Sequence, residues 1–170
     1  MGFMTRAVHN IGTAVWFGGT LMGCVALNPA VEVLDDPEER GKMVDEGWAR
    51  FQPWGAAGLG AAIVSHFLMR RNPPRRPSST YVSVARIKDV LMAAAAVSSL
   101  ASMALGEYAV NAEPDAYTPI ESATKPNEDT PEDAEKAQSG LTLVNWVLLL
   151  SGIGILATSA ILEGERERKI

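Results

Sequence analysis

The stretch that decides the fold spans residues 141–162 and reads LTLVNWVLLLSGIGILATSAIL, 22 residues without a charge. A helix needs about 20 apolar residues to cross the hydrocarbon core of a bilayer. A helix in a soluble bundle would show an apolar stripe opposite a charged face. Because this stretch is apolar on all sides, it predicts a membrane-spanning helix.

Three further stretches are apolar enough to cross a membrane: residues 7–27, 54–69 and 87–106. The first contains His9 but no charge, and the third is uncharged after Lys88 and Asp89 at its start. The second is short, so bilayer adjustment or a partly helical lead-in would have to complete the crossing. The sequence therefore predicts an all-α fold, a four-helix transmembrane bundle that forms a single membrane domain over residues 1–170.

The composition excludes several classes of protein. The chain has 170 residues, a formal net charge of −5 and a single cysteine, Cys24. One cysteine excludes an intramolecular disulfide framework and any zinc or iron–sulfur site built from several cysteines. Net acidity, without a basic stretch that is mixed with aromatic residues, argues against nucleic acid as a partner.

The distribution of lysine and arginine predicts the orientation. The basic loop 70–86 contains Arg-Arg-Asn-Pro-Pro-Arg-Arg-Pro, and the loops 28–53 and 107–140 together carry a charge of −11. Basic residues in short loops favour the cytoplasmic side. We therefore expect a multi-pass protein of the plasma membrane with a basic inner loop, two acidic outer loops, and both termini in the cytoplasm.

The two acidic outer loops differ in character. Residues 28–53 predict an amphipathic helix from about Pro37 to Gln52, capped by Asp35 or Asp36, that lies along the outer membrane face. Residues 107–140 contain four prolines and nine acidic residues. Such a composition contains few apolar side chains that could form a core, so we expect most of this loop to be extended or mobile. We also expect a short helix that starts near Pro131.

Ionisable residues inside the membrane are costly and are the first candidates for function. The candidates are His9, His66, Lys88 and Asp89. At about 1.5 Å per helical residue, all four lie within roughly one turn of the cytoplasmic boundary. One interpretation is a pocket for a metal, a haem or a lipid head group, with His9 and His66 as the cofactor ligands. The other is structural, with the charged groups reaching toward the interface and pairing there.

Small residues predict how the helices pack. Gly19 and Gly23 form a GxxxG pattern, and Gly12 lies seven residues before Gly19. Such residues let helix backbones approach closely within a membrane, and we expect them to serve packing within the bundle. The sequence Leu-Met-Gly before Cys24 is also similar to the site at which bacterial lipoproteins are lipidated. The alternative is an ordinary helix with a buried thiol.

No catalytic motif is present: the chain lacks a nucleophile elbow, a P-loop and a zinc-protease helix. The sequence therefore predicts a protein that is not an enzyme and needs no cofactor, a structural or accessory component of the membrane or of a membrane complex. Its expected partners are the lipid bilayer and other membrane proteins. Two alternatives remain open, a haem- or metal-binding protein that uses His9 and His66, and a small transporter.

Three parts of the chain carry a resemblance to known proteins: HNIGTAVWFGGTLMG at 9–23, GWAR at 47–50, and TPEDAEKAQ at 130–138 ahead of the last helix. In these parts the chain resembles a group of small, uncharacterised actinobacterial four-helix integral membrane proteins, a domain of unknown function. The resemblance implies a four-helix bundle and supplies no catalytic residues. In the first helix only, His9, Trp16 and Gly18 are also similar to the copper-resistance D family, but no further ligands accompany them.

Overall fold

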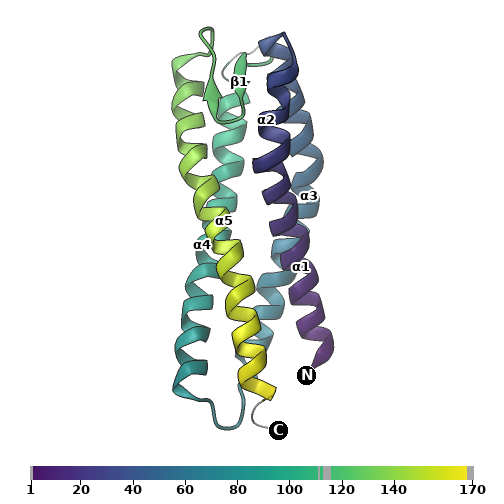
Figure 1. Ribbon diagram of the computed structural model, residues 1–170, viewed down its shortest axis with the longest axis vertical. Coiled ribbons are helices and arrows are strands. Elements are labelled where there is room, and N and C mark those ends of the chain that lie inside the picture. Colours follow the sequence, from purple (N-terminus) through teal and green to yellow (C-terminus); the bar gives the residue numbers. More distant parts are fainter. Residues whose placement is uncertain (1, 111, 113–115, 168–170) are drawn as a thin grey trace.

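The computed structural model describes residues 2–110, 112 and 116–167, and Figure 1 shows it as a bundle of long helices. Within these residues the four long helices are α1 (Phe3–Met22), α3 (Pro37–Arg70), α4 (Ser79–Val110) and α5 (Glu132–Glu167). The prediction of an all-α fold is confirmed.

Three helical runs are long and apolar enough to cross a membrane: Phe3–Val33, Ser79–Val110 and Glu132–Arg166. The predicted fourth span, residues 54–69, forms part of α3 and does not reach the same apolarity. The reason is its composition, because glycine, alanine, Ser65 and His66 replace the leucines and isoleucines of the other helices. The structure thus supports a membrane protein with three clear candidate spans.

The first helical run is longer than the predicted span 7–27. After α1, the chain continues through a π-helical turn, η1 (Gly23–Leu27), then α2 (Asn28–Ala30) and a 3₁₀ turn, η2 (Val31–Val33). Proline lacks an amide hydrogen and its ring clashes with the carbonyl group four residues earlier. The wide π turn just before Pro29 gives that ring room, so the helical run passes the proline instead of ending there.

The helix α3 corrects the prediction of a separate amphipathic helix over 37–52. The expected start is confirmed, because the Asp36 side chain accepts a hydrogen bond of 2.9 Å from the Glu38 amide. The helix then continues through Pro53 to Arg70. The first half of α3 packs against the first helical run, where the Trp48 indole donates a 2.9 Å hydrogen bond to Asn28 Oδ1. Trp48 and Phe51 therefore face the first helical run, whereas Trp54, which follows Pro53, is 69% exposed.

The expectation that residues 107–140 are mostly extended or mobile is wrong for the part that the structure describes. The helix α4 continues to Val110, and a small antiparallel hairpin of β1 (Ile120–Ser122) and β2 (Lys125–Pro126) precedes α5. An ion pair of 2.6 Å between Arg40 and Glu121 ties this hairpin to α3. Residues 111 and 113–115 lie outside the described residues.

The bundle consists of two helical hairpins. In Figure 1, α1 lies beside α3 and α4 lies beside α5, and these two pairs make most of the helix–helix contacts. The two hairpins meet in one apolar core: Trp16, Leu59, Ala62, Met92, Ala95, Leu148 and Ile155. The start of α1, the end of α5 and the loop between α3 and α4 lie at one end of the bundle, here called the basic end, and the β-hairpin lies at the other, the acidic end.

Candidate functional site

The structure brings the four predicted polar residues together at the basic end of the bundle. His9 comes from α1, His66 from α3, and Lys88 and Asp89 from α4. The imidazole rings of His9 and His66 have their centres 6.2 Å apart. Three helices that are distant in sequence therefore contribute to one polar cluster.

One half of this cluster centres on Ser159 of α5, which the sequence did not single out. Lys88 Nζ donates a 2.8 Å hydrogen bond to Ser159 Oγ, and His9 Nε2 lies 3.4 Å from the same oxygen. The other ring nitrogen, His9 Nδ1, donates to the carbonyl of Ala62 at 2.9 Å. His9 is 1% exposed and Lys88 is 2% exposed, so this half is closed to solvent.

The other half of the cluster joins the two hairpins through ion pairs. His66 Nε2 lies 2.7 Å from Asp89 Oδ1, and Arg70 lies 2.9 Å from the second oxygen of the same carboxylate. Arg166 of α5 adds a hydrogen bond of 2.9 Å to the Tyr81 hydroxyl. Asp89 thus accepts from two side chains of α3, which fixes α4 against the first hairpin.

These contacts favour a structural role over ligation for the two histidines. Both nitrogens of His9 and one nitrogen of His66 already face polar atoms of the protein. Among the described residues, no group of three or more His, Cys, Asp or Glu side chains is placed to hold a metal ion. The hydrogen bonds and ion pairs of the cluster therefore connect the two hairpins.

The three glycines that predicted helix packing all face α3. A Cβ atom on Gly12 would lie 2.5 Å from the carbonyl oxygen of Gly58, and one on Gly19 or Gly23 would meet the ring of Phe51 or Trp48. Close packing of α1 on α3 thus depends on the absence of side chains at these positions. Cys24, beside them in η1, is half-buried.

A cavity of about 500 Å³ separates the two hairpins in the half of the bundle nearer the β-hairpin. Its lining on α3 extends from Gly41 to Ala56, which corresponds to a length of about 22 Å at the helical rise per residue. The apolar part of the wall includes Trp16, Trp48, Phe51, Leu100, Met103 and Leu148. Pockets of this size and character are typical of sites for small molecules.

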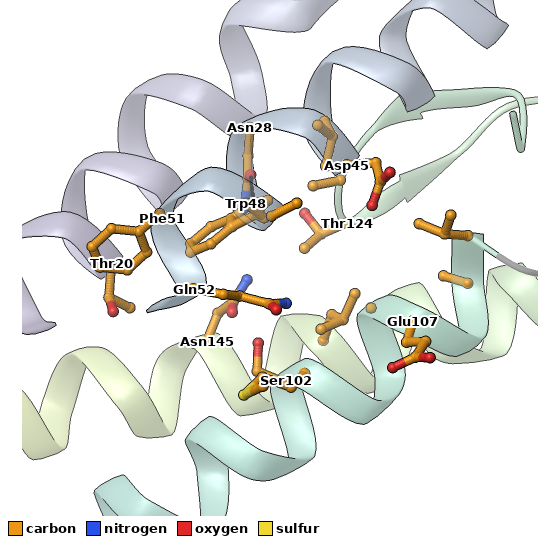
Figure 2. Close-up of a pocket in the computed structure, with 18 of the residues that line it drawn as sticks. Thr20, Asn28, Asp45, Trp48, Phe51, Gln52, Ser102, Glu107, Thr124 and Asn145 are labelled. Atoms are coloured by element: carbon orange, nitrogen blue, oxygen red, sulfur yellow. Dashed lines mark hydrogen bonds between the residues drawn. The ribbon is translucent and has the colours of Figure 1, made fainter. Parts of the chain in front are cut away.

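Polar side chains from three helices converge on the middle of the cavity. Figure 2 shows Gln52 of α3, Asn145 of α5 and Ser102 of α4 directed toward its centre. Within the described part of the chain, none of the three has a hydrogen-bond partner. Their donors and acceptors are therefore available to a molecule in the cavity.

The end of the cavity nearer the β-hairpin is acidic. Asp45 of α3 and Glu107 of α4 line it. Gln138 of α5 lines the cavity as well, and it donates to the carbonyl of Ser122 in β1. Burial, followed by the neighbouring Glu46, raises the pKa of Asp45 above its usual range. Gln138 is 2% exposed, and its Oε1 atom has no hydrogen-bond partner among the described residues. A buried acceptor without a partner is uncommon in a folded protein.

Two apolar side chains of α4 both line the cavity and are exposed on the outside of the bundle. Leu100 lines the cavity and is 68% exposed, and Met103, one turn further along, is 41% exposed. Both belong to a helical run that is apolar enough to cross a membrane. If α4 spans a membrane, the exposed parts of these two side chains face lipid.

Sequence reasoning found the polar cluster but missed the cavity. Ionisable residues in the apolar stretches predicted the polar cluster, whereas the cavity presents the neutral amides of Gln52 and Asn145. Asn145 stands in the charge-free stretch 141–162, and a buried amide in such a stretch is itself costly unless it has a partner. That cost marks Asn145 as a candidate, although it does not show that Asn145 and Gln52 line the same cavity.

No protein-family model, curated protein or solved structure matches this chain, so the resemblance to small actinobacterial membrane proteins stays a prediction and the site is interpreted from its own geometry.

Proposed function

We propose that the chain is a multi-pass protein of the plasma membrane in which all four long helices cross the bilayer. The close approach of Gly12 to Gly58 supports the fourth crossing, because it packs α3 against the candidate span that contains α1. The basic loop 70–86 and both termini face the cytoplasm in this proposal, since basic loops are retained there. The β-hairpin then faces outward.

We propose further that the protein binds an amphipathic small molecule in the cavity between its hairpins. The observation that supports this best is the cavity itself, with an apolar wall and three unpaired polar side chains at its middle. A lipid-like molecule would bury its apolar part against Trp16 and Leu148 and satisfy Gln52, Asn145 and Ser102. It would reach the site from the membrane beside Leu100, which lines the cavity and is exposed on α4.

This proposal specifies what a non-enzymatic, accessory protein of this kind would do. The protein would hold or present its ligand within the membrane, alone or as part of a complex. The haem- or metal-binding alternative is less favoured, because the nitrogen atoms of His9 and His66 are largely occupied by hydrogen bonds. An absorption spectrum and metal analysis of the purified protein would reopen it if they showed a Soret band or stoichiometric metal.

Cysteine labelling tests the orientation. Pro74 lies in the loop between α3 and α4, so in a Cys24→Ser background the Pro74→Cys variant places a single thiol at the basic end. We expect a membrane-impermeant maleimide to label this thiol only after the cells are opened. The matched control is Asn127→Cys near the β-hairpin, which should react in intact cells. The opposite pattern of labelling would contradict the proposed orientation.

Filling the cavity tests the proposed function. Gly106 lines the cavity, and a Cβ atom added there would meet nothing within 4 Å. We therefore expect Gly106→Phe to fold normally and to fill the space that the ligand needs. The measurement is quenching of tryptophan fluorescence by a brominated dodecyl chain in lipid nanodiscs, with the exposed Trp54 and Trp146 changed to Phe. Quenching of Trp16 and Trp48 should saturate in this background and be largely lost when Gly106→Phe is added.

The matched control is Gly60→Phe. Gly60 is an exposed helical glycine whose added Cβ would also meet nothing within 4 Å, but it does not line the cavity. Its quenching curve should follow that of the Trp54→Phe/Trp146→Phe background. Equal quenching in the Gly106→Phe and Gly60→Phe variants would show that the chain contacts the tryptophans from bulk lipid and would refute binding in the cavity.

A further inference from the structure

An exposed arginine lies on the apolar outer face of α4. Arg86 is exposed, and Val90, one turn further along the same face, is 68% exposed. Ile87, the next residue in the chain, is 54% exposed. Lys88 and Asp89, by contrast, take part in the polar cluster between the hairpins. Arg86 is therefore the charged residue that this part of α4 presents to the outside of the bundle.

The depth of Arg86 follows from the apolar stretch that it precedes. The helix α4 is long and apolar enough to cross a membrane, and residues 90–106 carry no charge. Residues 87–106 extend over about 30 Å in a helix, which is the thickness of the hydrocarbon core. If they fill the core, the guanidinium of Arg86 lies at the level of the lipid head groups. An arginine at this border can reach a phosphate group while its stem stays against apolar surface.

The protein itself provides no partner for this guanidinium. The side chain of Arg86 makes no ion pair or hydrogen bond with any residue that the structure describes. Of the acidic side chains at the basic end, Asp89 accepts from two side chains of α3, and Glu163 accepts from Asn10. Ser83, one turn before Arg86 on the same face, is exposed as well and adds a hydroxyl group. A guanidinium and a hydroxyl thus lie together beside apolar surface.

Resting on the proposed crossing of the bilayer by α4, but not on a ligand in the cavity, we propose that Arg86 and Ser83 bind an anionic phospholipid of the cytoplasmic leaflet. The planar guanidinium matches two oxygens of a phosphate group. The acyl chains would lie along Ile87, Val90 and Val97, all of which are exposed. A zwitterionic lipid brings its own ammonium group to the phosphate, so the site favours a lipid with a net negative charge.

Native mass spectrometry of the detergent-purified protein tests the site, with phosphatidylglycerol and phosphatidylcholine of equal chain length added as probes. We expect the wild type to bind phosphatidylglycerol more tightly. Arg86→Gln should weaken that binding roughly tenfold, because it removes hydrogen bonds between two charged groups. It should leave binding of phosphatidylcholine nearly unchanged. Since Arg86 is exposed and unpaired, we expect the variant to fold like the wild type.

Arg75→Gln is the matched control, because it removes the same charge from an exposed position in the loop at the same end. Its effect should be small, since a charge that lies in water is screened by salt. Equal weakening by Arg86→Gln and Arg75→Gln would show a diffuse attraction and would overturn the site on α4. Equal affinity of the wild type for the two lipids would overturn it as well.

The Gly106→Phe protein separates this site from the cavity. Phosphatidylglycerol should bind to it as to the wild type, because the site lies on the outer face of α4. Loss of that binding would place the lipid in the cavity and refute the surface site. Normal binding of phosphatidylglycerol to a wild-type protein that holds no cavity ligand would instead refute the proposed function alone. A lipid on this surface exchanges with its surroundings, so the probe is titrated rather than carried through purification.

Discussion

Replacing Gly12 with leucine is expected to force α1 away from α3 and to prevent the first hairpin from forming in its present geometry. A Cβ atom at this position would lie 2.5 Å from the Gly58 carbonyl oxygen and 3.0 Å from the Ala62 amide nitrogen, both of which belong to a helix backbone. A backbone cannot rotate away as a side chain can, so the helices must separate. We expect a loss of about 3 kcal/mol in the free energy of unfolding, the upper end of the usual cost of overpacking.

The measurement is unfolding in mixed micelles, followed by circular dichroism as the fraction of denaturing detergent rises. The control is Gly18→Leu, because Gly18 lies on the exposed side of the same helix and an added Cβ would meet nothing within 4 Å. That variant should unfold like the wild type. If both leucine variants have equal stability, the close contact between α1 and α3 is not part of the folded protein.

Replacing Ser159 with alanine is expected to destabilise the bundle by about 2 kcal/mol, because it removes the oxygen that accepts the hydrogen bond of Lys88. Lys88 is 2% exposed and has no other hydrogen-bond acceptor among the described residues. The change would thus leave a polar group buried without a partner. The free energy of unfolding in mixed micelles is again the quantity to measure.

Ser65→Ala is the matched control for this change. Ser65 is also a buried helical serine, but its hydroxyl donates only to carbonyls of its own helix, those of Ala61 and Ala62. We expect its effect to be small. Adding Lys88→Met to Ser159→Ala should recover most of the lost stability, because the unpaired nitrogen is then gone. If the double variant loses the sum of the two single effects, Lys88 and Ser159 do not interact.

The sequence predicted the helices better than it predicted their ends. Apolar stretches without charge predicted helical spans, because about 20 consecutive apolar residues are typical of a membrane-spanning helix. The continuous α3 was missed because Pro53 and the change from amphipathic to apolar composition suggested two separate segments. A helix can continue through a proline where packing against neighbouring helices compensates for the lost backbone hydrogen bond. The sequence of one segment does not show such packing.

The two sites differ in how far sequence could predict them. His9, His66, Lys88 and Asp89 could be brought together because depth in a membrane follows from counting residues along each helix. Ser159, which bonds to Lys88, gave no signal, since serine in an apolar helix commonly bonds to its own backbone. The cavity was beyond prediction for another reason. A space between hairpins depends on how far apart they stand, which no single segment encodes.

Native mass spectrometry of the protein extracted with its surrounding lipid tests the central claim most directly, because it measures the mass of any molecule that stays bound to the protein. We predict that the wild-type chain and Gly60→Phe each retain a single amphipathic molecule after the bulk lipid is stripped, and that Gly106→Phe is released bare. The same bound mass on all three proteins, or a bare wild-type chain, would contradict a ligand-binding cavity between the hairpins.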